Sequence, residues 1–80
     1  MANAMNHSKI YVSYRDGSKP KGTKVSIGFQ GTFGGMSKPA YTDRDGVAIV
    51  EHASTGMANV YVSGSNVGSF RAPGETAVFI

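Results

Sequence analysis

The chain contains no cysteine, which excludes a disulfide and a thiolate-ligated metal site. No apolar run approaches the about 20 residues that a membrane-spanning helix needs. Residues 1–8 are polar and lack the apolar stretch of a secretory signal. We therefore expect no signal peptide, no transmembrane segment and no membrane contact, and the compartment stays unknown.

The chain also lacks the sequence motifs of catalysis. No G-x-S-x-G or H-E-x-x-H occurs, and no Gly-Lys-Ser/Thr follows the glycines. His52 ends a predicted strand, where we expect it at the surface. Asp43-x-Asp45-Gly46 resembles the start of a calcium loop, but Glu51 comes one residue too early for the bidentate ligand. We predict a non-catalytic protein with no metal and no cofactor, and an ordinary hairpin turn at Gly46.

What the chain does contain is repeated alternation of apolar and polar residues, the period of a half-buried strand. No window has a helical period, and turn-forming residues recur between the runs. Pro39, which has no N–H to donate to a neighbouring strand, predicts a position near a sheet edge for the third run. The predicted strands cover residues 10–15, 24–29, 38–42, 47–52, 57–63, 67–71 and 76–80.

This pattern predicts one all-β domain over residues 9–80, after a disordered N-terminal tail over residues 1–8. The expected architecture is a seven-stranded antiparallel Greek-key β-sandwich. A five-stranded OB-like barrel is the alternative. A chain of 80 residues buries only roughly 60% of its unfolded surface, so packing alone, or a partner subunit, has to stabilise the core.

Three segments carry a family resemblance. Asp16-Gly17-Ser18-Lys19-Pro20-Lys21-Gly22 precedes a strand of alternating apolar residues, Thr42-Asp43-Arg44-Asp45-Gly46 precedes another, and Gly56 opens a third. Over about residues 9–80 the chain resembles the carboxypeptidase regulatory-like domain, a transthyretin-like (prealbumin-like) sandwich of the broader Ig-like kind. The resemblance implies a structural or protein-interaction module that accompanies other domains or joins a larger assembly.

Two groups of apolar side chains are candidates for ligand or partner binding. Phe33 and Met36 lie in the glycine-rich residues 30–36, where glycine allows close backbone approach; the alternative is that Phe33 covers the end of the sandwich. Tyr11 and Tyr61 are predicted on outer faces of the sheets. Exposed tyrosines can stack on sugars or bases, and they also form ordinary cross-strand pairs. A carbohydrate- or small-ligand-binding sandwich is therefore one alternative function.

Basic residues gather early in the chain, where only Asp16 opposes them, and the net charge is +3. Such a cluster can mark a weak nucleic-acid binder, but lysines also decorate turns and protect edge strands. The members of this basic patch are Lys9, Arg15, Lys19, Lys21 and Lys24.

The last predicted strand, residues 76–80, is uncharged and apolar at its end. An unprotected edge strand of this kind invites pairing with another chain. We therefore expect a protein partner or a larger assembly, and a dimer formed through this edge is one form it can take.

Overall fold

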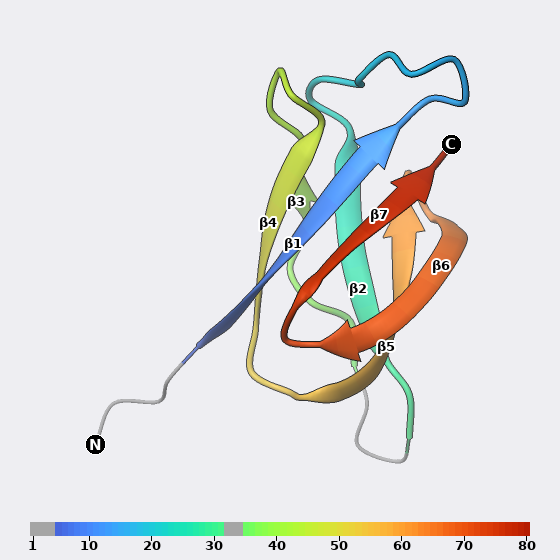
Figure 1. Cartoon of the computed structure of the whole chain (residues 1–80). Helices are drawn as coiled ribbons and strands as arrows, with labels where there is room; N and C mark the ends of the chain where they lie inside the picture. Colours follow the sequence, from blue (N-terminus) through green and yellow to red (C-terminus); the bar gives the residue numbers. More distant parts are fainter. Residues whose placement is uncertain (1–4, 32–34) are drawn as a thin grey trace.

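The computed structural model describes residues 5–31 and 35–80, which form seven strands (Figure 1). No helix in this described part is long and apolar enough to cross a membrane. The strands are β1 (Asn6–Ser13), β2 (Lys24–Phe29), β3 (Ala40–Tyr41), β4 (Val47–His52), β5 (Gly56–Val62), β6 (Ser65–Ala72) and β7 (Glu75–Phe79).

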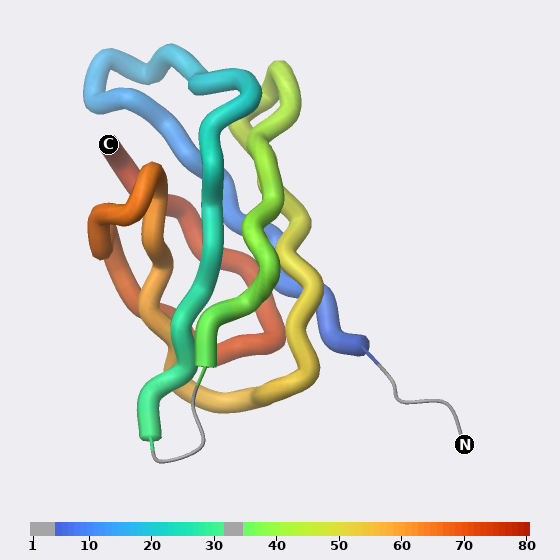
Figure 2. Tube along the Cα trace, turned by 180° about the vertical axis from the view of Figure 1, so that it is seen from behind, coloured from blue at the N-terminus to red at the C-terminus, as the bar shows by residue number. Residues whose placement is uncertain are grey.

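The strands form two sheets that pack face to face. One sheet has three strands in the order β4-β1-β7, and the other has four in the order β3-β2-β5-β6. Figure 2 shows the four-stranded sheet in front, with β1 crossing behind it. The sheets are not closed into a barrel, so the OB-like alternative is wrong, whereas the prediction of a seven-stranded sandwich is confirmed.

One strand pair departs from the expected antiparallel arrangement: β1 and β7 run parallel, with Lys9 opposite Glu75 and Val12 opposite Val78. The parallel direction of β7 follows from the point at which the chain crosses from one sheet to the other, between β6 and β7. The N–H of Lys9 donates to the carbonyl of Gly74 at 2.9 Å, so β7 begins beside the first half of β1 and then runs in the same direction. The prediction of a wholly antiparallel sandwich is therefore wrong at this pair.

Several strand ends also differ from the predictions. β1 begins at Asn6, so the last residues of the expected tail belong to a sheet, and Ser8 is fully buried. Tyr14 lies outside β1, because its N–H donates to the Ser18 carbonyl in a turn. β3 keeps only Ala40–Tyr41 of the predicted residues 38–42, in keeping with the missing N–H of Pro39.

The core lies between the sheets. It consists of the alternate residues of the strands that face inward, as the sequence predicts. Ile10, Ile27, Ala58 and Val60 are completely buried. The remaining buried apolar side chains are Val12, Val25, Ala48, Val50, Val62, Phe70, Ala72 and Val78.

The predicted hairpin turn at Asp43–Gly46 is present. The Asp43 carboxylate accepts the N–H groups of Asp45 at 2.8 Å and Val47 at 3.0 Å. Gly46 has a φ of 76°, in the left-handed region that favours glycine. Its carbonyl accepts the N–H of Val12 at 2.8 Å, so this turn also fixes the position of β1.

Candidate functional site

The outward side of the three-stranded sheet is not covered by a second layer. Its side chains follow from the two-residue period of the strands, whose other residues face the core. We call this surface the outer face; it includes His7, Lys9, Tyr11, Val47, Ile49, Glu51, Glu75, Ala77 and Phe79.

Polar contacts tie the three strands of the outer face together. His7 lies 3.2 Å from Glu51 on the neighbouring strand, and the Tyr11 hydroxyl donates to Glu75 at 3.0 Å. The ammonium of Lys9 lies 6.0 Å from the centre of the Tyr11 ring. Exposed pairs of this kind add little to stability, so their main effect is to orient the side chains of this surface.

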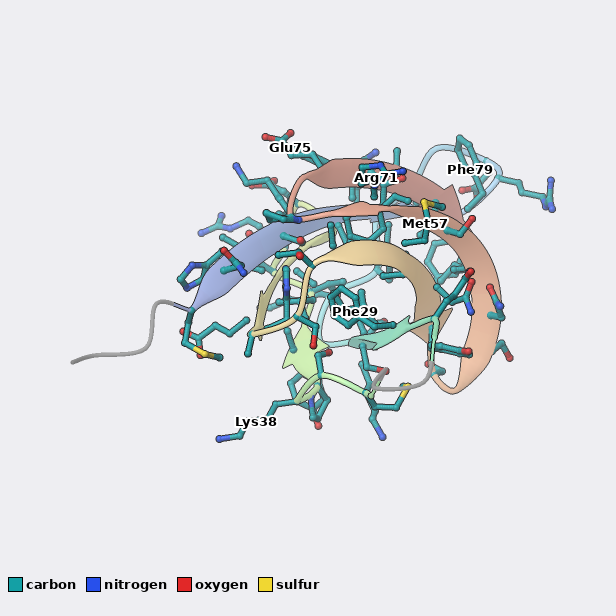
Figure 3. All side chains as sticks on the ribbon, turned by 90° about the horizontal axis from the view of Figure 1, so that it is seen from below. Phe29, Lys38, Met57, Arg71, Glu75 and Phe79 are labelled. Atoms are coloured by element: carbon teal, nitrogen blue, oxygen red, sulfur yellow. The ribbon has the colours of Figure 1, made fainter. Side chains whose placement is uncertain are left out.

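Two open hollows meet at Ile49, whose side chain is 53% exposed. One, of about 450 Å³, runs from His7 and Ile49 across Lys9 to Gly74 and Glu75. The other, of about 360 Å³, runs from Ile49 and Glu51 toward the chain before β3, where Lys38 points away from the sandwich (Figure 3). The outer face thus has an apolar centre with charged groups around it.

A second polar feature lies inside the sandwich, where Ser8 and His52 form a hydrogen bond of 2.7 Å between Oγ and Nε2. The other ring nitrogen of His52, Nδ1, lies 2.8 Å from the Ser54 carbonyl. A carbonyl only accepts, so Nδ1 carries the proton and Nε2 accepts the Ser8 hydroxyl. The N–H of Gly74 donates to Ser8 Oγ at 3.2 Å.

The expected surface position of His52 is therefore wrong: its side chain is 3% exposed, and its ring lies 5.2 Å from that of Phe29. Figure 3 shows Phe29 between the two sheets. A serine next to a histidine is also the arrangement that activates a nucleophile, yet Ser8 is 1% exposed. The hydrogen bonds of both side chains are made within the fold, so the pair joins β1, β4 and the start of β7.

The candidate apolar residues from the sequence do not form one surface. Phe33 lies outside the described residues. Met36 is exposed and lines a hollow of about 190 Å³ with Phe29 and His52. Tyr11 is on the outer face, whereas Tyr61 belongs to β5 of the four-stranded sheet, where its ring lies beside Gly28. The two tyrosines therefore do not share a stacking platform.

The basic patch is also divided. Arg15, Lys19 and Lys21 lie in the connection from β1 to β2, and Lys24 begins β2. Lys9 lies instead on the outer face. The ammonium of Lys19 donates to Ser13 Oγ at 2.8 Å, so this lysine holds its own loop against β1.

Asp16, the acidic residue within the patch, closes a local turn. Its carboxylate accepts the hydroxyl of Ser18 at 2.7 Å and the N–H of Ser18 at 2.9 Å. These two hydrogen bonds hold the pKa of the Asp16 carboxyl below its usual range. The negative charge therefore stays among the basic residues of this loop.

Within residues 5–31 and 35–80, no three histidine, aspartate or glutamate side chains gather where they could hold a metal ion. No protein-family model, curated protein or solved structure significantly matches the chain. The findings define the class of protein as an all-β domain of two packed sheets, and they identify no family.

Proposed function

We propose that the protein is a non-catalytic structural or protein-interaction module of the carboxypeptidase regulatory-like, prealbumin-like kind. The resemblance rests on turns, and two of these turns have the hydrogen bonds that their sequences predict. Asp16 caps the first through Ser18, and Asp43 caps the second through Asp45 and Val47. The arrangement of seven strands in two sheets agrees with that of the family.

One observation carries the interaction role: the outer face presents exposed Ile49 where two hollows meet. An apolar centre within a polar rim is the usual make-up of a protein-binding surface. The non-catalytic role is supported by the enclosure of Ser8 and His52, because a nucleophile has to reach its substrate.

The test compares two lysine substitutions at exposed apolar residues on different sheets. Ile49→Lys places a charge at the centre of the outer face, and Met57→Lys is the matched control on the four-stranded sheet. Proteins cross-linked to the chain in its host cell are identified by mass spectrometry. We expect Ile49→Lys to lose them and Met57→Lys to retain them. Equal recovery with both variants would remove the outer face as the interaction surface.

Two binding measurements cover the alternative ligands. A glycan array tests the carbohydrate alternative, and oligonucleotide binding at increasing salt tests the basic patch, because phosphate contacts give a steep salt dependence. We expect no specific binding in either. Saturable glycan binding, or oligonucleotide binding that weakens steeply with salt, would replace the proposed function.

A further inference from the structure

The edge strands of the two sheets differ in how well they are protected from pairing with another chain. β3 is two residues long and follows Pro39, and β6 contains Arg71 and a bulge opposite Val60 and Tyr61. Short strands, prolines, bulges and basic residues all discourage pairing. β4 and β7, the two edges of the three-stranded sheet, have none of these features. Of these two described strands, β4 ends in the polar residues Glu51 and His52, whereas β7 ends in uncharged, apolar residues, so β7 is the more open to pairing.

The hydrogen bonds between β1 and β7 show which backbone groups of β7 face its open edge. The Gly74 carbonyl accepts from Lys9, and the N–H of Ile80 donates to Ser13. In a parallel ladder, alternate residues bond to the same neighbour. The polar groups of Thr76, Val78 and Ile80 therefore point toward β1, and those of Glu75, Ala77 and Phe79 point toward the open edge.

The side chains along this edge suit pairing with an identical strand. In an antiparallel pair with its two-fold axis at Ala77, Ala77 lies opposite Ala77 of the second copy. Glu75 then lies opposite Phe79, so no like charges face each other, and two small alanines meet at the axis. Both Glu75 and Phe79 point away from the core in Figure 3, and Phe79 is 59% exposed.

We propose that β7 pairs with β7 of a second copy in this register, joining the two three-stranded sheets into one continuous sheet. This inference rests on the proposed role in assembly and names a partner for it, although it does not depend on Ile49. A pair of five-residue strands buries far less than the roughly 1,200 Å² of a stable interface. The dimer is therefore weak and forms at high protein concentration.

The register is tested by a cysteine placed at the two-fold axis. Residues that exchange both hydrogen bonds in an antiparallel pair have Cα atoms about 5.5 Å apart, within the range of a disulfide. Because the chain has no cysteine, Ala77→Cys adds a single thiol. Under mild oxidation at about millimolar protein we expect Ala77→Cys to form the disulfide dimer at least about tenfold faster than Gly17→Cys, a thiol in a distant exposed turn. Equal rates would overturn the register.

The dimer itself is tested without a covalent bond. Sedimentation of the unaltered chain up to roughly millimolar concentration should show a reversible dimer; a monomer throughout would overturn the proposal, while leaving the Ile49 cross-linking test unaffected. Ala77→Pro removes an N–H that β1 does not use, and should raise the dissociation constant about tenfold or more. Phe79→Glu, which leaves the β7 backbone unaltered and places a second carboxylate opposite Glu75 of the other copy, should act in the same direction. A dimer of unchanged affinity in either folded variant would contradict the assignment to β7.

Discussion

The hydroxyl of Ser8 donates to Nε2 of His52 across 2.7 Å, linking two strands whose residues are 44 positions apart in the sequence. Both side chains are buried, and each has a second partner: Ser8 accepts from Gly74, and His52 donates to the Ser54 carbonyl. The four groups form a continuous chain of hydrogen bonds, from the Gly74 N–H to the Ser54 carbonyl, that requires one ring tautomer. Such a network stabilises a core when every member is satisfied and costs free energy when one is removed.

Ser8→Ala is therefore expected to destabilise the fold by about 1–3 kcal/mol. The substitution leaves Nε2 of His52 without a donor and the N–H of Gly74 without an acceptor. Urea unfolding, followed by circular dichroism, measures the change in free energy. Ser69→Ala, at an exposed position of β6, is the control and should stay within about 0.5 kcal/mol of the unaltered chain. An equal, small effect of both substitutions would show that the network does not contribute.

Thr42 makes a similar contribution at the opposite end of the sandwich. Its hydroxyl donates to the Pro20 carbonyl at 2.8 Å and accepts the N–H of Thr23 at 3.0 Å, with the side chain 4% exposed. We expect Thr42→Val to cost about 1–3 kcal/mol, because the shape is kept and both backbone groups lose a partner. Thr42→Ser keeps the hydroxyl and loses one buried methyl, at about 1 kcal/mol.

The comparison of these two Thr42 variants separates hydrogen bonding from packing. Thermal unfolding of both, measured in the same buffer, gives the order of stability. The structure requires the serine variant to be the more stable of the two. A valine variant as stable as the unaltered chain would show that the hydrogen bonds to Pro20 and Thr23 do not contribute to stability.

The turn at Asp16 gives a prediction about pH. The folded-state pKa of this carboxyl lies below its usual range because Ser18 donates two hydrogen bonds to the charged form. The resulting stabilisation is present above the unfolded-state pKa and is lost as the pH falls through the folded-state pKa. Carboxyl NMR titration should show that Ser18→Ala raises the pKa of Asp16, since the hydroxyl is the larger cause. An unchanged titration curve in Ser18→Ala would contradict this account.

Much of the fold is encoded in local alternation and can be predicted from the sequence. Val25 and Ile27 face the core and β4 runs from Val47 to His52, as the pattern indicates. The same pattern contains a signal for the burial of His52, which shares the inward positions of Ala48 and Val50. A histidine at a strand end suggests the surface until its partner is known, and that partner, Ser8, comes from a distant strand.

The parallel pairing of β7 could not be predicted, because it depends on where the chain crosses between sheets and not on the residues of either strand. Glu75 is next to Lys9 only once the turn at Gly74 is in place. The outer face has the same origin: Ile49 and Glu75 are brought to either side of Lys9 by topology. Alternation alone predicts that these residues face outward, and it does not predict which strands are neighbours.

Gly46 gives a prediction in which Gly17 serves as the matched control. The comparison separates the free-energy cost of a left-handed backbone from the cost of a steric clash. Both Gly46 and Gly17 have positive φ, of 76° and 93°, so alanine at either position incurs the left-handed penalty of about 1–2 kcal/mol. At Gly17 an added Cβ meets nothing within 4 Å, whereas at Gly46 it would contact the Val12 carbonyl and the Lys19 side chain. Gly46→Ala has to move β1 or the turn, and this movement weakens the hydrogen bond between the Val12 N–H and the Gly46 carbonyl. We expect Gly46→Ala to lower the urea midpoint clearly more than Gly17→Ala does, and amide exchange at Val12 to speed up only in the former. Equal midpoints would show that the turn at Gly46 does not position β1.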